Sequence, residues 1–236
     1  QRAAAAGHQP LLQALLDKGA DAGKALVWAA GHGRHALVDL LLARQPGRAS
    51  ISQAMYTAAG TSHTDIVKTL LDAGADVNAI GGRHNSSALT RAAEKPVPAT
   101  VQMLLERGAN VNLKSSQGET ALLAAAWPWS SSADAPEVAQ RLQIVRVLLD
   151  KGADIEARMQ SMQTWQPTAL LVAIDQRLTP VAQLLIERGA DVNAQTGDTG
   201  GDQRQLSALM RAAREGLAEV VAALLAKGAV VDARNQ

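Results

Sequence analysis

The sequence predicts an all-α solenoid of stacked antiparallel helix pairs, and three observations lead to this fold class. One short phrase, an apolar pair followed by two spacers and Gly-Ala, recurs along the 236 residues. An apolar stripe at helical spacing precedes the phrase. A Ser/Thr-Ala-Leu phrase stands earlier in several units, where it can cap another helix. Self-similarity of this kind indicates units that bury their apolar faces only against their neighbours.

The recurring phrase marks the end of each unit. It reads Leu-Leu-Asp-Lys-Gly-Ala-Asp over residues 15–21 and Leu-Leu-Asp-Ala-Gly-Ala-Asp over 70–76, and a degenerate copy covers 41–47. Glycine at this place suits the left-handed conformation that ends a helix. The aligned glycines stand at positions 19, 47, 74, 108, 152, 189 and 228. We therefore expect about seven units in a single domain over residues 1–236.

Each full unit is expected to hold two helices joined by a tight connection. The second, outer helix is exemplified by residues 66–71, where Ile-Val and Leu-Leu recur four residues apart and form one buried stripe. The first, inner helix is exemplified by Ser-Ala-Leu-Thr-Arg-Ala-Ala over residues 87–93. The Ser caps the helix, and the small Ala-Ala pair lets it press against the next unit.

Further phrases extend the pattern to most of the chain. Gly-Ala-Asp-Val-Asn stands complete over 74–78 and 189–193, and outer helices begin with Ser-His-Thr-Asp-Ile-Val over 62–67 and Gly-Leu-Ala-Glu-Val-Val over 216–221. These phrases resemble the ankyrin repeat, whose period is about 33 residues. The resemblance implies short fingers between units and inner helices that line a concave groove.

The chain departs from the family pattern at identifiable positions. Ala replaces the family's Pro at 88, 121, 169 and 208, and Thr90, Leu123, Leu171 and Met210 replace its His. The units that end at 47 and 74 are shorter than the others. We therefore expect short or absent fingers near the N-terminus.

Composition argues against several classes of function. The formal net charge is +1 without a long run of like charges, which argues against a nucleic-acid-binding protein. No apolar run is long enough to span a membrane. The absence of Cys excludes disulfides and thiolate metal sites, and the five His residues show no set of metal ligands. We find neither Gly-x-Ser-x-Gly nor a phosphate loop, so we expect no enzyme activity, no metal and no cofactor.

Insertions in a solenoid cluster on one face, which is often the binding face. The largest insertion, residues 127–136, contains Trp-Pro-Trp, and an extended finger between 152 and 168 contains Trp165. One interpretation is that Trp127, Trp129 and Trp165 anchor a partner, because Trp is enriched at binding hot spots. The other is that their rings fold back onto the array and fill gaps.

The resemblance also directs attention to the groove. Residues around the Ala-Ala pairs of the inner helices are expected to face it, and a set containing Trp, Tyr and Arg has the composition of a protein interface. The competing interpretation is a solvated helix face with internal ion pairs of little energetic value. The predicted partner-binding residues are Trp28, Tyr56, Arg91, Trp127, Trp129, Trp165 and Arg211.

We expect a non-enzymatic protein-binding module that holds one dedicated protein partner, as a monomer or in a hetero-complex, on its concave groove and C-terminal insertions. The Ala-rich composition without Phe or Cys suggests a bacterial protein. The resemblance implies an immunity or inhibitor protein of a toxic effector, or an accessory factor of an enzyme. A host-directed effector and a scaffold arm of a larger chain are alternatives. A start at Gln1, directly before the first repeat, favours the periplasm, with the cytoplasm as the alternative.

Overall fold

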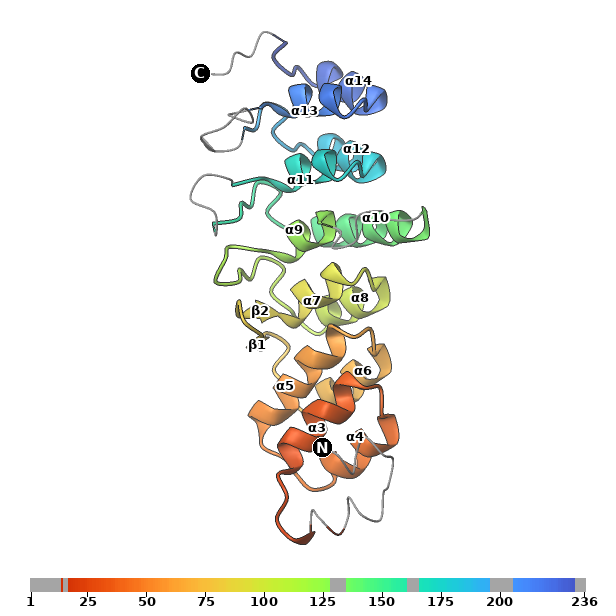
Figure 1. The fold of residues 1–236 in the computed structure, drawn as a ribbon, viewed down its shortest axis with the longest axis vertical. Coiled ribbons are helices and arrows are strands. Elements are labelled where there is room, and N and C mark those ends of the chain that lie inside the picture. The colour runs from red at the N-terminus through yellow and green to blue at the C-terminus, as the bar shows by residue number, and fades with distance from the viewer. Residues whose placement is uncertain (1–13, 15–16, 128–134, 161–165, 196–205, 232–236) are drawn as a thin grey trace. The chain divides into compact units, whose positions relative to one another are not determined.

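The computed structural model of the chain describes residues 14, 17–127, 135–160, 166–195 and 206–231. The chain divides into two compact units, Gln1–Asn110 and Val111–Gln236, which are described separately below. The described residues form twelve helices, arranged as six consecutive pairs (Figure 1). The helix-rich architecture confirms the predicted all-α solenoid. The first predicted repeat falls mostly outside the described residues, so the count of seven and the single domain stay predictions.

The described part of the N-terminal unit, from Ala22 onward, contains three helix pairs in two layers. The inner helices are α3 (Ala22–Gly31), α5 (Arg48–Ala59) and α7 (Ala88–Glu94), and the outer helices are α4 (His35–Leu42), α6 (Thr64–Asp72) and α8 (Pro98–Glu106). Each inner helix packs against the next inner helix and against its own outer helix. One finger contains a short antiparallel hairpin of β1 (Ile80–Gly81) and β2 (Ser86–Ser87), with Ile80 opposite Ser87.

The C-terminal unit repeats this arrangement. Its inner helices are α9 (Ala121–Ala126), α11 (Ala169–Asp175) and α13 (Ala208–Arg214), and its outer helices are α10 (Ala135–Asp150), α12 (Thr179–Glu187) and α14 (Ala218–Ala226). The inner helices again pack in sequence order, and so do the outer helices. A single bridge pairs Gln195 with Ser207 at the base of one finger.

The core is the continuous layer between the two rows of helices in each unit. The predicted stripe of α6 is confirmed, since Ile66, Val67, Leu70 and Leu71 are all buried. The Ala-Ala pair of α7, Ala92 and Ala93, is fully buried, because small side chains allow close approach of neighbouring helices. Burial of each apolar stripe, rather than intrinsic propensity, stabilises helices as short as the six residues of α9.

Ser and Thr cap four of the six described inner helices, as the sequence predicts. The hydroxyl oxygen of Ser87 accepts a hydrogen bond from the backbone N–H of Thr90 (3.0 Å), and Ser207 caps α13 in the same way through Met210 (3.3 Å). Thr120 and Thr168 occupy the equivalent positions of α9 and α11. These bonds satisfy a donor that the helix itself cannot pair.

Most of the aligned glycines end helices in the left-handed region, with φ of 88° at Gly74 and 81° at Gly152. Gly47 differs: its φ is −60°, and it precedes α5 as the N-cap residue. Gln45 instead adopts the left-handed conformation, with φ of 50°. The expectation that Gly47 ends its helix in the left-handed region is therefore wrong, because the connection to α5 is too short to place the glycine there.

Polar contacts join neighbouring repeats within each unit. The side-chain Oδ1 of Asn78 accepts a hydrogen bond from the backbone N–H of Asn110 (2.7 Å), and Nη2 of Arg107 donates to Oδ1 of Asp72 (2.7 Å). The same two kinds of contact recur for Asn112 with Asp154, for Asn193 with Val230, and for Arg188 with Asp150. The backbone contacts hold the register between fingers, whereas exposed ion pairs of this kind add little stability.

Helix α10 is 16 residues long, whereas the other outer helices have eight or nine. Part of the insertion predicted to interrupt a turn is therefore helical, because α10 begins at Ala135. Arg141 lies in the added turns and is buried. Its Nη1 donates to the carbonyl oxygen of Ala125 (2.9 Å), and its Nε donates to Glu137 (2.9 Å). This arginine supplies donors to the C-terminal end of α9, where backbone carbonyls lack helical partners.

Candidate functional site

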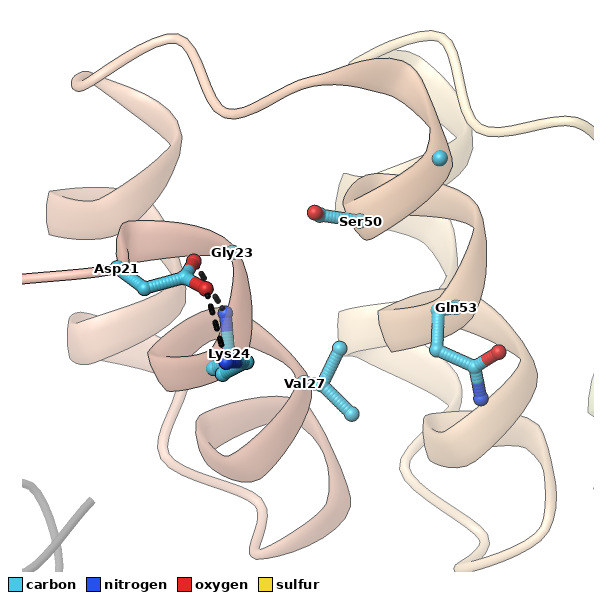
Figure 2. Close-up of a pocket in the computed structure, with 7 residues that line it drawn as sticks. Asp21, Gly23, Lys24, Val27, Ser50 and Gln53 are labelled. Carbon is cyan, nitrogen blue, oxygen red and sulfur yellow. Dashed lines mark hydrogen bonds and ion pairs between the residues drawn. The ribbon is translucent and has the colours of Figure 1, made fainter.

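The inner helices α3 and α5 border an open hollow of 440 Å³ (Figure 2). It is lined by Asp21, Gly23, Lys24, Val27, Ala49, Ser50 and Gln53. A side chain at Gly23 would collide with Ser50 Oγ, so the absence of a Cβ lets the two helices approach at this end. Figure 2 shows Val27 and Ser50 between the helices. The lining of the hollow therefore combines apolar groups with polar and charged ones.

Asp21 caps α3 at one end of this hollow. Its carboxylate accepts a hydrogen bond from the backbone N–H of Lys24 (3.1 Å), and its other oxygen lies 3.6 Å from Lys24 Nζ. The backbone hydrogen bond, and to a smaller degree the Lys24 charge, hold the pKa of Asp21 below its ordinary value. A negative charge is therefore kept at the N-terminus of α3, where the helix dipole favours it.

Trp28 and His32 form a stacked pair at the C-terminal end of α3. Their ring centroids are 4.1 Å apart, with 17° between the ring planes. His32 Nδ1 lies 2.8 Å from the carbonyl oxygen of Trp28, and because a carbonyl can only accept, Nδ1 carries the donated proton. Trp28 is half-buried and His32 is exposed. The pair forms a flat aromatic surface whose orientation is fixed by the backbone hydrogen bond.

Arg91 lies on α7, two inner helices further along the same unit. Its Nη1 donates to Glu94 on the same helix, and the Arg91 side chain is 31% exposed. A Cβ at Gly60 would lie 3.0 Å from both Nε and Nη2 of Arg91. The guanidinium therefore extends over the end of α5, where a glycine leaves room for it.

Tyr56 is buried on α5 beneath the finger that contains β1 and β2. Its hydroxyl lies 3.1 Å from Ser86 Oγ, and its ring lies directly under Gly81 and Gly82. Any side chain at either glycine would collide with the ring. The exposed part of Tyr56 is too small for it to anchor a partner directly, and its packing supports the finger instead.

Two of the predicted residues in the C-terminal unit have defined positions. Trp127 follows α9 as its C-cap residue and is half-buried. Arg211 is buried on α13, where its Nη1 donates to Asp175 Oδ2 (2.6 Å) and its Nε donates to the carbonyl oxygen of Leu206 (3.2 Å). Arg214 Nη2 lies 3.8 Å from the other oxygen of Asp175. Arg211 thus joins α13 to α11 inside the unit. Trp129 and Trp165 lie outside the described residues.

The structure therefore separates the predicted residues into two groups. Trp28, Arg91 and Trp127 retain surface that a partner can reach, whereas Tyr56 and Arg211 act within the array. Sequence reasoning missed the hollow-lining residues Lys24, Val27 and Gln53, although 24, 27 and 28 share one face of α3 at helical spacing. The accessible groups are aromatic, apolar and hydrogen-bonding, which is the composition of a contact surface.

Two other kinds of feature are absent from the part of the chain that the structure describes. No group of three His, Cys, Asp or Glu side chains there is placed to hold a metal ion. None of the described helices combines the length and the apolar character that crossing a membrane requires.

Comparison with known proteins identifies the repeat. A family model described as ankyrin repeats in three copies matches residues 1–81 and 137–235, and a second model of ankyrin repeats matches residues 89–128. Together these matches include both described units and most of the chain.

Similar proteins include several eukaryotic relatives. The chain is 38% identical over 106 residues to human "Ankyrin repeat and SOCS box protein 6", a match that covers 44% of this chain and 24% of that protein. It is 30% identical over 185 residues to mouse "B-cell lymphoma 3 protein homolog", covering 77% of this chain and 37% of that protein. It is 29% identical over 179 residues to the chicken "Nuclear factor NF-kappa-B p105 subunit", covering 74% and 16%. The chain thus spans well under half of each relative.

Proposed function

The chain belongs to the ankyrin-repeat family, and from this premise we propose that it is a non-enzymatic module that binds one dedicated protein partner on its inner helices. Ankyrin repeats imply a protein–protein interaction module. The finer proposal is that the contact surface in the N-terminal unit extends from the hollow between α3 and α5 to Arg91. The single observation that carries it is the Trp28–His32 stack, a half-exposed aromatic pair held in place on α3, the helix that also borders the open hollow.

These groups contribute binding free energy when a partner covers them. A rigid aromatic pair loses little conformational entropy on binding, and desolvated Trp and Arg side chains supply most hot-spot energy, about 2 kcal/mol or more each. Lys24 and Gln53, which line the hollow, add hydrogen bonds that favour a matching partner. We propose a contribution of Trp127 from the C-terminal unit and retain Trp129 and Trp165 as candidates.

The biological role is a further part of the proposal. An immunity or inhibitor protein of a toxic effector, or an accessory factor of an enzyme, remains the leading assignment, in a bacterial protein of the periplasm. This part rests on the Ala-rich composition without Phe or Cys, whereas the relatives named above are eukaryotic. A host-directed effector and a scaffold arm are the alternatives.

The test is affinity capture from the native organism with three baits, followed by quantitative mass spectrometry. The first bait is the parent chain, and the second carries Trp28→Ala with Gln53→Ala on the inner helices. The third carries Lys68→Ala with Gln102→Ala, which lie in a hollow of 460 Å³ on the outer helices α6 and α8. Each bait must first show a melting temperature close to that of the parent.

We expect a dedicated partner to be recovered with the parent bait and with the outer-helix bait. The inner-helix bait should recover much less of it. Equal recovery on all three baits would place the contact away from this surface. Copurification of a secreted toxin or of an enzyme would decide between the two leading roles.

A further inference from the structure

Arg91 and Arg211 occupy equivalent places in two repeats. Each stands in a Ser-Ala-Leu-x-Arg-Ala-Ala phrase at the start of an inner helix. The residues that they face on the preceding inner helix are also equivalent, because Gly60 and Asp175 each directly follow the buried pair of that helix. The two arginines therefore share a local sequence and differ in what the neighbouring helix offers them.

Arg211 finds its acceptors inside the C-terminal unit. Asp175 on α11 accepts from its Nη1 at 2.6 Å, and the carbonyl oxygen of Leu206 accepts from its Nε at 3.2 Å. The Arg211 side chain is only 2% exposed. The donors of this arginine are therefore paired inside the array, where its own repeat packs against the preceding one.

Arg91 meets no acid on the preceding helix, because Gly60 stands where the other repeat has Asp175. Its Nη1 donates to Glu94 on its own helix. Within the described residues, its Nε and Nη2 have no acceptor, and this edge of the guanidinium is directed at the place where a side chain of residue 60 would begin. The side chain is 31% exposed, so solvent and a partner can both reach it.

We propose that Arg91 binds the carboxylate of an Asp or Glu side chain supplied by the protein partner, in place of the internal acid that the equivalent arginine has. This inference rests on the proposed function and adds the chemistry of the partner: an acidic segment that lies along α5 and α7. The Nε and Nη2 groups carry two parallel N–H donors that match a carboxylate, and a small rotation of the partly exposed side chain away from Gly60 turns them toward a partner. Lys95, exposed at the end of α7, adds positive charge beside it.

A variant can supply the missing acid from within the chain. Gly60→Asp places a carboxylate next to Arg91, as in the other repeat, and should close the site to an external acid. The backbone tolerates the change, because φ at Gly60 is −76°, and the nearest atoms to a new Cβ belong to the mobile end of the Arg91 side chain. Gly60→Asn has the same shape without the charge and is the matched control.

The experiment pans a library of random 15-residue peptides, displayed with amidated or blocked C-termini, against the whole chain. The tightest peptide is then synthesised, and its affinity is measured by fluorescence anisotropy. We expect an Asp or Glu at one position, and replacement by Asn or Gln should weaken binding roughly 10- to 100-fold, as for hydrogen bonds to charged groups. Gly60→Asp and Arg91→Gln should weaken the parent peptide by a similar factor, whereas Gly60→Asn, which displaces the guanidinium equally but does not neutralise its charge, should weaken it clearly less.

Binders that require a free C-terminal carboxylate, checked with synthetic acid and amide forms, would overturn the assignment to an acidic side chain. Binders without an acidic position, or with affinities unchanged by Arg91→Gln, would overturn the role of Arg91. If such binders are lost in Trp28→Ala, the protein-binding proposal itself still stands. A library that yields no binder to the parent chain would count against the inference as well.

Discussion

The hydroxyl of Tyr56 on α5 lies 3.1 Å from Ser86 Oγ on β2, and both side chains are buried. This contact joins an inner helix to the finger of the following repeat. Gly81 and Gly82 lie against the Tyr56 ring, so the finger is held from beneath by one aromatic side chain. The finger therefore depends on a residue that lies 30 positions before Ser86 in the chain.

Removing the Tyr56 hydroxyl should loosen this finger. We expect Tyr56→Phe to lower the free energy of unfolding by about 1 kcal/mol, because Ser86 loses its buried partner. Urea denaturation measures the change, and hydrogen exchange at the Gly81 amide should become faster. In a Ser86→Ala background the same substitution should cost clearly less; an equal cost would mean that the hydroxyl pair is not coupled.

Gln45 adopts a left-handed conformation that glycine tolerates better. Gln45→Gly should therefore raise the free energy of unfolding, by up to about 1 kcal/mol, since a side chain in this region is strained. Thermal and urea unfolding provide the measurement. The matched comparison is Gly74→Ala, where φ is 88° and the change should destabilise. Destabilisation by Gln45→Gly would show that unfolded-chain entropy outweighs the relief of strain.

Arg141 is buried between α9 and α10, and its loss leaves polar groups without a partner. Arg141→Leu should destabilise the chain by about 3–5 kcal/mol, because Glu137 and the carbonyl of Ala125 lose a charged donor. Replacing Glu137 by Leu as well should recover part of that loss in a denaturation series. If the single variant melted like the parent, the described burial of the guanidinium would be contradicted.

The capping contact of Asp21 on α3 predicts how the stability of the chain changes at low pH. Because the pKa of Asp21 is lowered in the folded chain, its contribution to stability is present above the ordinary value of 3.8 and is lost as the pH falls through the lower folded pKa. Asp21→Asn keeps a capping oxygen but removes this titration. The difference in melting temperature between parent and variant should therefore shrink from pH 6 to pH 3. A constant difference over that range would contradict the lowered pKa.

Much of the fold could be predicted because the repeat signals are local. Ser87 caps α7 through a hydrogen bond three residues away, and the stripe that includes Leu70 follows from helical spacing alone. The prediction failed at Gly47, where the connection to α5 shifted the left-handed residue to Gln45. Register within a short turn depends on how the next helix packs, which the local phrase does not contain.

The candidate site was harder to predict. Trp28 and Arg91 retain accessible surface, as expected of contact residues, but Tyr56 and Arg211 are buried by neighbours that lie far away in the sequence. The hollow beside Val27 was missed because it arises between two helices rather than within one. Aromatic and Arg residues mark both interfaces and internal supports, so residue type alone could not separate them.

By itself, the sequence determined the repeat, the helix pairs, the caps and the apolar stripes, since each depends on residues within a few positions of one another. Only the tertiary structure decided which side chains remain available to a partner. Arg91 and Arg211 stand in nearly the same phrase, yet Arg91 is partly exposed whereas Arg211 is buried and paired with Asp175. The difference is the residue on the preceding helix, Gly60 or Asp175, because access and pairing of a side chain are set by the neighbour against which it packs.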